Sequence, residues 1–278
     1  MRLSHNLASL NIYKNYSKSL IAQSKAMKNI SSGYKISSAK DDPNVIAQSE
    51  KIRMQIRGAQ MASRNTQDTM SMLQTADGAL DNMTSMLQRI RELTVQAGNG
   101  TYTPEDKATM QNEIEQLKAG YNDIAKNTEF NGNKLLSTAK TTETMVGPNS
   151  DEKIVIPFYD LTSGNIPSIS PDSLEDLDVT TDISKSLDII DKTLDFVTKV
   201  RSKYGALENR LESTYNNMDE LSEKMENADS QLVDADVAEE MINYSKASIL
   251  SQAGIAMMVQ SNKFPQEVLN SLASVGRR

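Results

Sequence analysis

Apolar residues recur at alternating spacings of three and four along most of the first half of the chain. One series occupies every seventh position from Val45 to Thr94, and a second series, shifted by three residues, begins at Ala62. A heptad pattern of this length is typical of a long helix of coiled-coil type. Pro43 suits the first turn of this helix, and the glycines at 98 and 100 mark its end.

Four further segments share this helical spacing, and we expect helices at about residues 103–127, 183–232, 3–32 and 237–262. The two terminal segments carry sparse apolar stripes, so these helices are marginal alone and become stable only when packed on something. Unsatisfied faces at both ends of one chain suit head-to-tail contacts. Where such contacts do not close into a ring, they generate a helical filament.

The middle of the chain, about residues 137–182, differs in kind because it holds four of the seven prolines. Two short runs, 142–146 and 153–159, flank a turn-forming cluster at 147–151, which predicts a β-hairpin. We expect the rest of this region to be a loop with little core of its own. The predicted fold is therefore mainly α, with a small β-hairpin in the central region.

Composition excludes most catalytic chemistry. The chain has no cysteine and one histidine, His5, so it can build neither thiol nucleophiles nor multi-histidine metal sites. The acidic pairs Asp41–Asp42 and Asp234–Asp236 are better explained as helix-start charges than as metal ligands. We expect no enzyme activity, no catalytic residues, no metal site and no cofactor.

Charge is distributed unevenly along the chain. Residues 1–64 carry a net charge of +8 and residues 171–240 a net charge of −12. We expect the basic segment to lie against the acidic segment of its own chain or of a neighbour, and not against nucleic acid. No 18-residue apolar run exists, so we expect no membrane insertion. The first residues lack a secretory signal pattern, which predicts export without a cleaved signal peptide.

The sequence resembles bacterial flagellin over nearly all of residues 1–136 and 183–272. The motifs that carry the resemblance follow in family order: NLASLNI at 6–12, SSGYKISSAKDD at 31–42, QIRG at 55–58, ASRNTQD at 62–68, LQTADGAL at 73–80, LQRIRELTVQA at 87–97, TEFNGNKLL at 128–136, RSKYGALENRL at 201–211, SQAGIAM at 251–257 and PQEVL at 265–269.

This resemblance implies a long antiparallel helical bundle, or coiled coil, formed from both chain ends. Residues 1–44 and 233–278 would be inner-core terminal helices that form a tube. Residues 45–136 and 183–232 would form an outer-core helical bundle. Residues 137–182 would be the hairpin and loop left from the variable region, a short form that lacks the large outer domains of many flagellins.

The function implied is that of a structural subunit that polymerises into the extracellular flagellar filament for swimming motility. Implied partners are further copies of the chain, filament cap and hook-associated proteins, and a cytoplasmic export chaperone that binds the C-terminal helix. The resemblance also implies recognition by the host flagellin-sensing Toll-like receptor, through Leu87, Arg89, Leu93 and Glu113. The residues expected at the polymerisation interface are apolar and terminal: Leu3, Leu7, Leu10, Ile249, Ile255, Met258 and Leu269.

Two other functions compete with that of a filament subunit. A hook–filament junction protein shares the terminal helices, but the full set of motifs at 73–136 argues against it. A flagellin that houses a protease would need a catalytic domain in the variable region, and residues 137–182 are too short for one and contain no histidine.

Overall fold

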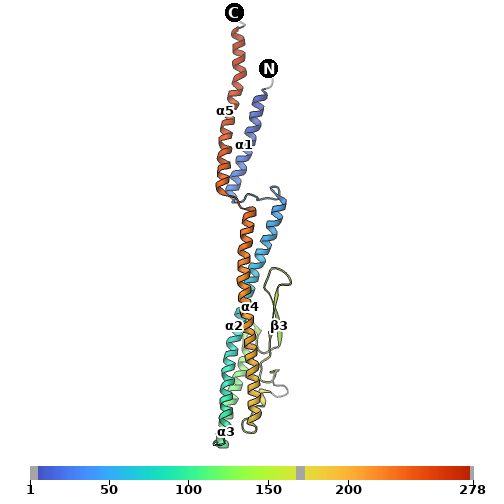
Figure 1. Cartoon of the computed structure of the whole chain (residues 1–278), viewed down its shortest axis with the longest axis vertical. Coiled ribbons are helices and arrows are strands. Elements are labelled where there is room, and N and C mark those ends of the chain that lie inside the picture. Colours follow the sequence, from blue (N-terminus) through green and yellow to red (C-terminus); the bar gives the residue numbers. More distant parts are fainter. Residues whose placement is uncertain (1–5, 167–172, 276–278) are drawn as a thin grey trace. The chain divides into compact units, whose positions relative to one another are not determined.

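The computed structural model describes residues 6–166 and 173–275, and within the last helix the side chains of Leu269 and of residues 271–275 are not described. The chain divides into two compact units (Figure 1). The first unit combines the residues up to Met54 with those from Met225 onward, and the second runs from Gln55 to Lys224.

The described elements confirm the mainly α prediction. In chain order they are α1 (Leu7–Ser32), α2 (Pro43–Ala97), α3 (Pro104–Asn127), β1 (Glu129–Phe130), β2 (Asn133–Lys134), β3 (Lys140–Met145), β4 (Lys153–Phe158), a 3-10 turn (Leu174–Asp176), α4 (Ile183–Val233) and α5 (Val237–Val275).

Helix α2 begins and ends where the sequence pattern places it. The Asp42 carboxylate accepts hydrogen bonds from the backbone N–H groups of Asn44 and Val45, at 3.0 and 3.2 Å, and so satisfies donors of the first turn. The first heptad series is buried from Ala59 onward, and the second is buried throughout. The buried members are Ala59, Ala62, Thr66, Thr69, Leu73, Ala76, Leu80, Met83, Leu87, Ile90, Thr94 and Ala97.

Helix α3 is fixed at its start by a capping box. The Thr103 hydroxyl accepts from the backbone N–H of Asp106 at 3.2 Å, and the Asp106 carboxylate accepts from the backbone N–H of Thr103 at 3.0 Å. Hydrogen bonding by Thr103 holds the pKa of Asp106 below its ordinary value, which keeps the carboxylate charged at the positive end of the helix.

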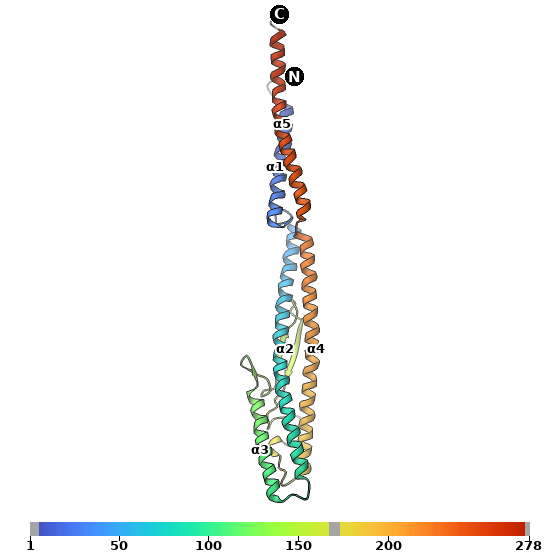
Figure 2. The same ribbon diagram turned by 90° about the vertical axis from the view of Figure 1, so that its left-hand side faces the viewer.

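Helices α2 and α4 run antiparallel, as predicted, and α3 lies alongside α2 in the second unit (Figure 2). Arg201 of α4 forms ion pairs with Asp77 and Asp81 of α2 at 2.9 and 2.6 Å. Further along α2, Arg91 pairs with Asp191 at 2.7 Å. Because the partner's number falls as the α2 number rises, the two helices point in opposite directions.

The predicted hairpin is present as β3 and β4, which pair antiparallel from Lys140 opposite Phe158 to Met145 opposite Lys153. Alternate residues of β4, Ile154, Ile156 and Phe158, are buried against the helices. A second, shorter hairpin of β1 and β2 forms where the sequence predicts only a turn. Its two-residue loop places Asn131 and Gly132 at φ 50° and 78°, the positive values that such tight turns require.

The expectation that the rest of the middle region has little core is wrong for its described part. Leu161, Ile166, Leu174, Leu177 and Val179 are all at most 3% exposed and belong to the main core of the second unit. These apolar residues occur singly between polar ones, so no periodic pattern in the sequence predicts their burial. Residues 167–172 lie outside the description.

Helix α5 extends past its predicted end near residue 262 and reaches Val275, with Pro265 inside it. A proline within a helix removes one backbone donor and usually kinks or ends the helix, and so the sequence favours an earlier stop. At the other terminus, the predicted start at Leu3 falls outside the described residues.

Candidate assembly and recognition surfaces

Helices α1 and α5 lie side by side in the first unit, as both ribbon views show (Figures 1 and 2). Polar contacts hold both ends of this pair. The Asn6 side chain caps α1 by accepting from the backbone N–H of Ser9 at 3.1 Å, and its amide donates to the carbonyl of Ser261 at 3.0 Å. At the far end, the Asn29 amide donates to the Glu240 carboxylate at 2.9 Å.

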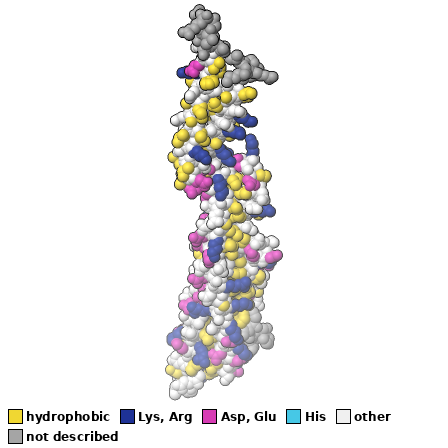
Figure 3. All heavy atoms as spheres, turned by 45° about the horizontal axis from the view of Figure 1, so that its top comes forward, with side chains coloured by type: hydrophobic (Ala, Val, Ile, Leu, Met, Phe, Trp, Pro, Cys, Tyr) yellow, Lys and Arg dark blue, Asp and Glu magenta, His cyan; other side chains and the backbone are white. Residues whose placement is uncertain are grey.

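The helix pair buries almost no apolar material of its own. Of the 34 buried hydrophobic residues that the structure describes, only Ala26 and Ala247 belong to α1 or α5. Of the 21 large hydrophobic side chains described as exposed, 15 lie on these two helices. Figure 3 shows apolar side chains gathered over this part of the molecule. Such a concentration marks an interaction surface, because soluble monomers rarely expose contiguous apolar patches of this kind.

Most residues expected at the polymerisation interface have exposed side chains. Leu7 and Leu10 of α1 are 71% and 63% exposed, and Ile249 and Ile255 of α5 are 66% and 49% exposed. Met258 is half-buried. Leu3 lies outside the described residues, as does the side chain of Leu269.

The sequence analysis missed other members of this apolar surface. Ile21 and Ile242 are both 68% exposed, and Tyr13, Met241 and Phe264 are exposed too. Helical spacing identifies a stripe, whereas only packing decides whether the chain itself covers it.

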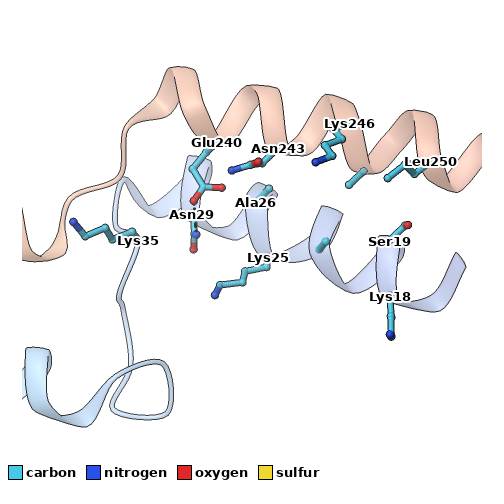
Figure 4. A pocket seen from close by; sticks show the side chains of 12 residues that line it. Lys18, Ser19, Lys25, Ala26, Asn29, Lys35, Glu240, Asn243, Lys246 and Leu250 are labelled. Atoms are coloured by element: carbon cyan, nitrogen blue, oxygen red, sulfur yellow. Dashed lines mark hydrogen bonds between the residues drawn. The ribbon is translucent and has the colours of Figure 1, made fainter. Parts of the chain in front are cut away.

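An open groove lies between α1 and α5 (Figure 4). Asn29 and Glu240 meet across it, and Lys246 reaches into it from α5. Lys18 and Lys25 also belong to its lining, but in the close-up both project from the same side of α1, away from α5. Positive charge therefore predominates around the groove.

Asp229 ties α2 to α4 in the first unit. Its carboxylate accepts from the Ser49 hydroxyl at 2.5 Å and from Arg53 Nε at 2.8 Å. Burial alone would raise the pKa of Asp229, but the hydrogen bonds from Ser49 and Arg53 outweigh burial and hold the pKa below its ordinary value. Backbone hydrogen bonds from Lys35 to Val233 and from Ala235 to Gly33, each 2.8 Å, join the neighbouring connections.

A second surface lies on α2 and α3 around Arg89. The guanidinium donates to Glu113 Oε1 from Nε at 3.1 Å and from Nη2 at 2.8 Å, and Nη1 lies 3.4 Å from Glu92. The hydrogen bond to Glu113 is the main cause that raises the pKa of Arg89. Both side chains of the Arg89–Glu113 pair are about half exposed, so a partner can reach them.

The structure separates the four residues expected at the receptor-binding site into two kinds. Arg89 and Glu113 are at the surface, whereas Leu87 and Leu93 are 0% and 3% exposed and lie in the core. These leucines can therefore support the surface from below but do not offer their side chains to a partner. Spacing reveals only part of this division, because Leu87 occupies a heptad position that faces the interior whereas Leu93 belongs to neither heptad series.

Comparison with known proteins assigns the family. Residues 3–141 match the bacterial flagellin N-terminal helical region, and residues 187–272 match the bacterial flagellin C-terminal helical region. A flagellin of Halalkalibacterium halodurans is 42% identical, over 98% of this chain and all of that protein. The chain belongs to the bacterial flagellin family. A flagellin of Bacillus subtilis is 39% identical, again over 98% of this chain and all of the relative.

This flagellin is a structural subunit of the flagellar filament, which is the extracellular part of the flagellum, and its family is structural and not enzymatic. Among solved structures, a hook-associated protein from Vibrio parahaemolyticus is similar with a TM-score of 0.58 and 14% identity, over 70% of this chain and all of that one. At this identity the likeness shows the fold alone.

The described residues contain neither a candidate metal site nor a membrane-spanning helix. No group of three or more potential metal-ligating side chains comes together among them. None of the helices in the described ranges combines the length and the hydropathy of a membrane span. Asp236, which the sequence suggested as a helix-start charge, accepts from the backbone N–H of Ala238 at 2.8 Å in the first turn of α5.

Proposed function

We propose that α1 and α5 are the assembly elements of this flagellin, and that they pack their exposed apolar side chains against the same helices of neighbouring copies. The observation that carries the proposal is the concentration of 15 exposed large hydrophobic side chains on two helices that bury only two alanines. Full burial of one such side chain is worth about 1.5–3 kcal/mol, so even partial coverage of this set exceeds what the helix pair gains within the chain.

We assign the layers of the filament from the difference in apolar burial between the terminal helices and the rest of the chain. We assign residues 1–44 and 233–278 to the inner, tube-forming layer, because their described side chains leave apolar surface uncovered. Residues 45–136 and 183–232 form the outer layer, supported by the buried heptad positions of α2. Residues 137–182, with the β3–β4 hairpin, complete the outer layer.

A substitution pair tests the assembly proposal. Ile249→Asp places a charge on the exposed face of α5, and we expect it to prevent elongation from filament seeds, because an unpaired charge in an apolar contact is costly. Val155→Asp is the matched control, since Val155 is 47% exposed on β4 of the second unit. Elongation is followed by light scattering and electron microscopy. Filaments of ordinary length from Ile249→Asp subunits would overturn the proposal.

Helix α5 is also our candidate for contact with the cytoplasmic export chaperone. Its exposed apolar side chains before assembly support this assignment, as does their position on one terminal helix. Copurification of the chaperone with the full chain, and its loss on truncation after residue 236, is the expected result. Retention by the truncated chain would exclude α5. Filament cap and hook-associated proteins would meet the same terminal helices.

We further propose that a host Toll-like receptor that senses flagellin recognises the Arg89–Glu113 surface. Arginine is enriched at binding hot spots, and here its ion pair with Glu113 holds it in one orientation before binding. Arg89→Ala is expected to weaken signalling about tenfold or more in reporter cells that express the receptor. The control is Arg91→Ala, also on α2 and also in an ion pair. Equal signalling by the two variants would refute this recognition site.

A hook–filament junction protein is the alternative function. Similarity to a hook-associated fold is compatible with it, and the terminal helices would serve either role. Purified chain that forms no filaments under nucleating conditions, as seen by electron microscopy, would favour the alternative.

A further inference from the structure

Four lysines form a stripe along one side of α1. Lys14, Lys18, Lys25 and Lys28 follow one another at intervals of four, seven and three, and all are exposed. Residues at these intervals share one face of a helix. Ala26 is buried, and Figure 4 shows Lys18 and Lys25 projecting away from α5. We call this set the lysine stripe.

The lysine stripe is not neutralised within the described residues. Only Lys28 has a carboxylate partner, Asp41, at 3.7 Å. Glu240, the carboxylate in the nearby groove, is engaged by the Asn29 amide. Like charges three and four residues apart on a helix repel one another. If α1 lies in an assembly interface, the lysine stripe therefore needs negative charge opposite it, supplied by another segment of the assembly.

The chain carries a set of carboxylates with the required spacing. Glu212, Asp219 and Glu223 of α4 follow one another at intervals of seven and four, on one side of that helix, and all three are exposed. None of them forms an ion pair with a described residue. We call this set the acidic stripe. It lies in the segment 171–240, whose net charge of −12 contrasts with +8 for residues 1–64.

We propose that, in the filament, the lysine stripe of α1 docks on the acidic stripe of α4 in a neighbouring copy, with the two helices antiparallel. The intervals match position for position in this direction: Lys14 meets Glu223, Lys18 meets Asp219, and Lys25 meets Glu212. Intervals of four and seven along α1 correspond to four and seven read backward along α4. About twelve residues of each helix, a length of about 16 Å, would be in register.

This contact rests on the proposal that α1 is an assembly element. It adds a fixed register and direction, which apolar packing alone does not supply. Apolar contacts are non-directional, and a face of leucines and isoleucines tolerates several registers. Exposed ion pairs contribute little to affinity, but complementary charges fix register and exclude wrong partners, because like charges in contact are penalised. The lysine stripe would thus set which neighbour α1 meets and in which direction.

Charge reversal in two separate subunits tests the contact. One variant carries Lys18→Glu and Lys25→Glu, and the other carries Glu212→Lys and Asp219→Lys. Each alone should elongate seeds about tenfold more slowly or worse, because two of the three pairs in each contact then bring like charges together. A one-to-one mixture of the two should recover elongation, because each variant then finds its complement in the other. Raising the salt to about 1 M should lessen each separate defect, since screening shortens the reach of charges.

A control reverses two lysines outside the stripe, Lys126→Glu and Lys140→Glu, with the same change in net charge. Elongation of the control at the ordinary rate, together with rescue by mixing, supports the contact. Three results would overturn it: unimpaired elongation of either stripe variant, no recovery in the mixture, or recovery only when all four substitutions stand in one chain. The outcome is independent of Ile249→Asp, which tests assembly through apolar packing and has no charge-reversed complement.

Discussion

Replacement of Gly58 by alanine has two opposite effects of similar size on stability, a gain in helix propensity and a loss from a close contact. Gly58 lies in the interior of α2, and a Cβ added there would be 2.9 Å from the Cβ of Pro148 and 3.3 Å from its Cα, at the turn between β3 and β4. Real Cβ atoms essentially never approach so closely, and the obstacle is a proline ring and backbone, which have no rotamer to change. The hairpin must therefore move, or the helix must.

The magnitudes decide the expected sign. Alanine is favoured over glycine in a helix interior by about 1 kcal/mol. Overpacking of a closed contact typically costs about 1–3 kcal/mol. The net effect of Gly58→Ala is then a loss of about 0–2 kcal/mol in the free energy of unfolding. Gly78→Ala is the matched control in the same helix, because nothing lies within 4 Å of its added Cβ. It should gain about 1 kcal/mol.

The assay is thermal unfolding of the soluble chain, followed by circular dichroism at the helical band. For a unit of this size, about 1 kcal/mol shifts the midpoint by roughly 2–4 °C, so Gly78→Ala should melt a few degrees above Gly58→Ala. Pro148→Gly removes the obstructing Cβ and should cancel much of the difference in a double-mutant cycle. If Gly58→Ala stabilised the chain as much as Gly78→Ala, the close contact of the hairpin with α2 would be refuted.

Two further predictions concern buried polar groups. Asp229→Asn should weaken the link to Ser49 and Arg53 by about 1–2 kcal/mol, seen as faster amide hydrogen exchange at residues 225–233, and unchanged exchange would contradict it. Because its pKa is depressed, Asp229 stabilises the fold fully at neutral pH and loses this effect as the pH falls below about 4, a dependence that Asn should abolish. Tyr204→Phe and Tyr121→Phe remove buried hydroxyls without a described hydrogen-bond partner, so thermal unfolding should show equal or higher stability, and a clear loss would reveal a partner.

The long helices were predictable because their signals are local and repeated. Heptad spacing fixed the buried face of α2, and Asp42 and Gly98 mark its ends by capping chemistry that acts within one turn. The hairpin of β3 and β4 was found in the same way, from alternation on both sides of a turn cluster.

What the sequence missed depends on contacts between distant segments. Leu161 and Leu174 have no periodic neighbours, yet both are fully buried, because the helices leave apolar surface that this region covers. Leu93 belongs to the motif that the resemblance to flagellins links to receptor recognition, but packing buries it. In each case the deciding partner is far away in the chain, and a local pattern holds no information about it.

Apolar burial, and not apolar content, distinguishes the terminal helices, because α1 and α5 are the most apolar helices in a chain whose residues are 38% hydrophobic. The second unit buries its apolar residues in a closed core. In α1 and α5, by contrast, the buried hydrophobic residues that the structure describes are two alanines, and 15 large apolar side chains are exposed. A helix that is stabilised little by packing within its own chain needs packing against another chain, since isolated helices are only marginally stable in water. The deficit in apolar burial is therefore concentrated in the terminal helices, where burial would depend on neighbouring subunits, and assembly would become the last step of folding.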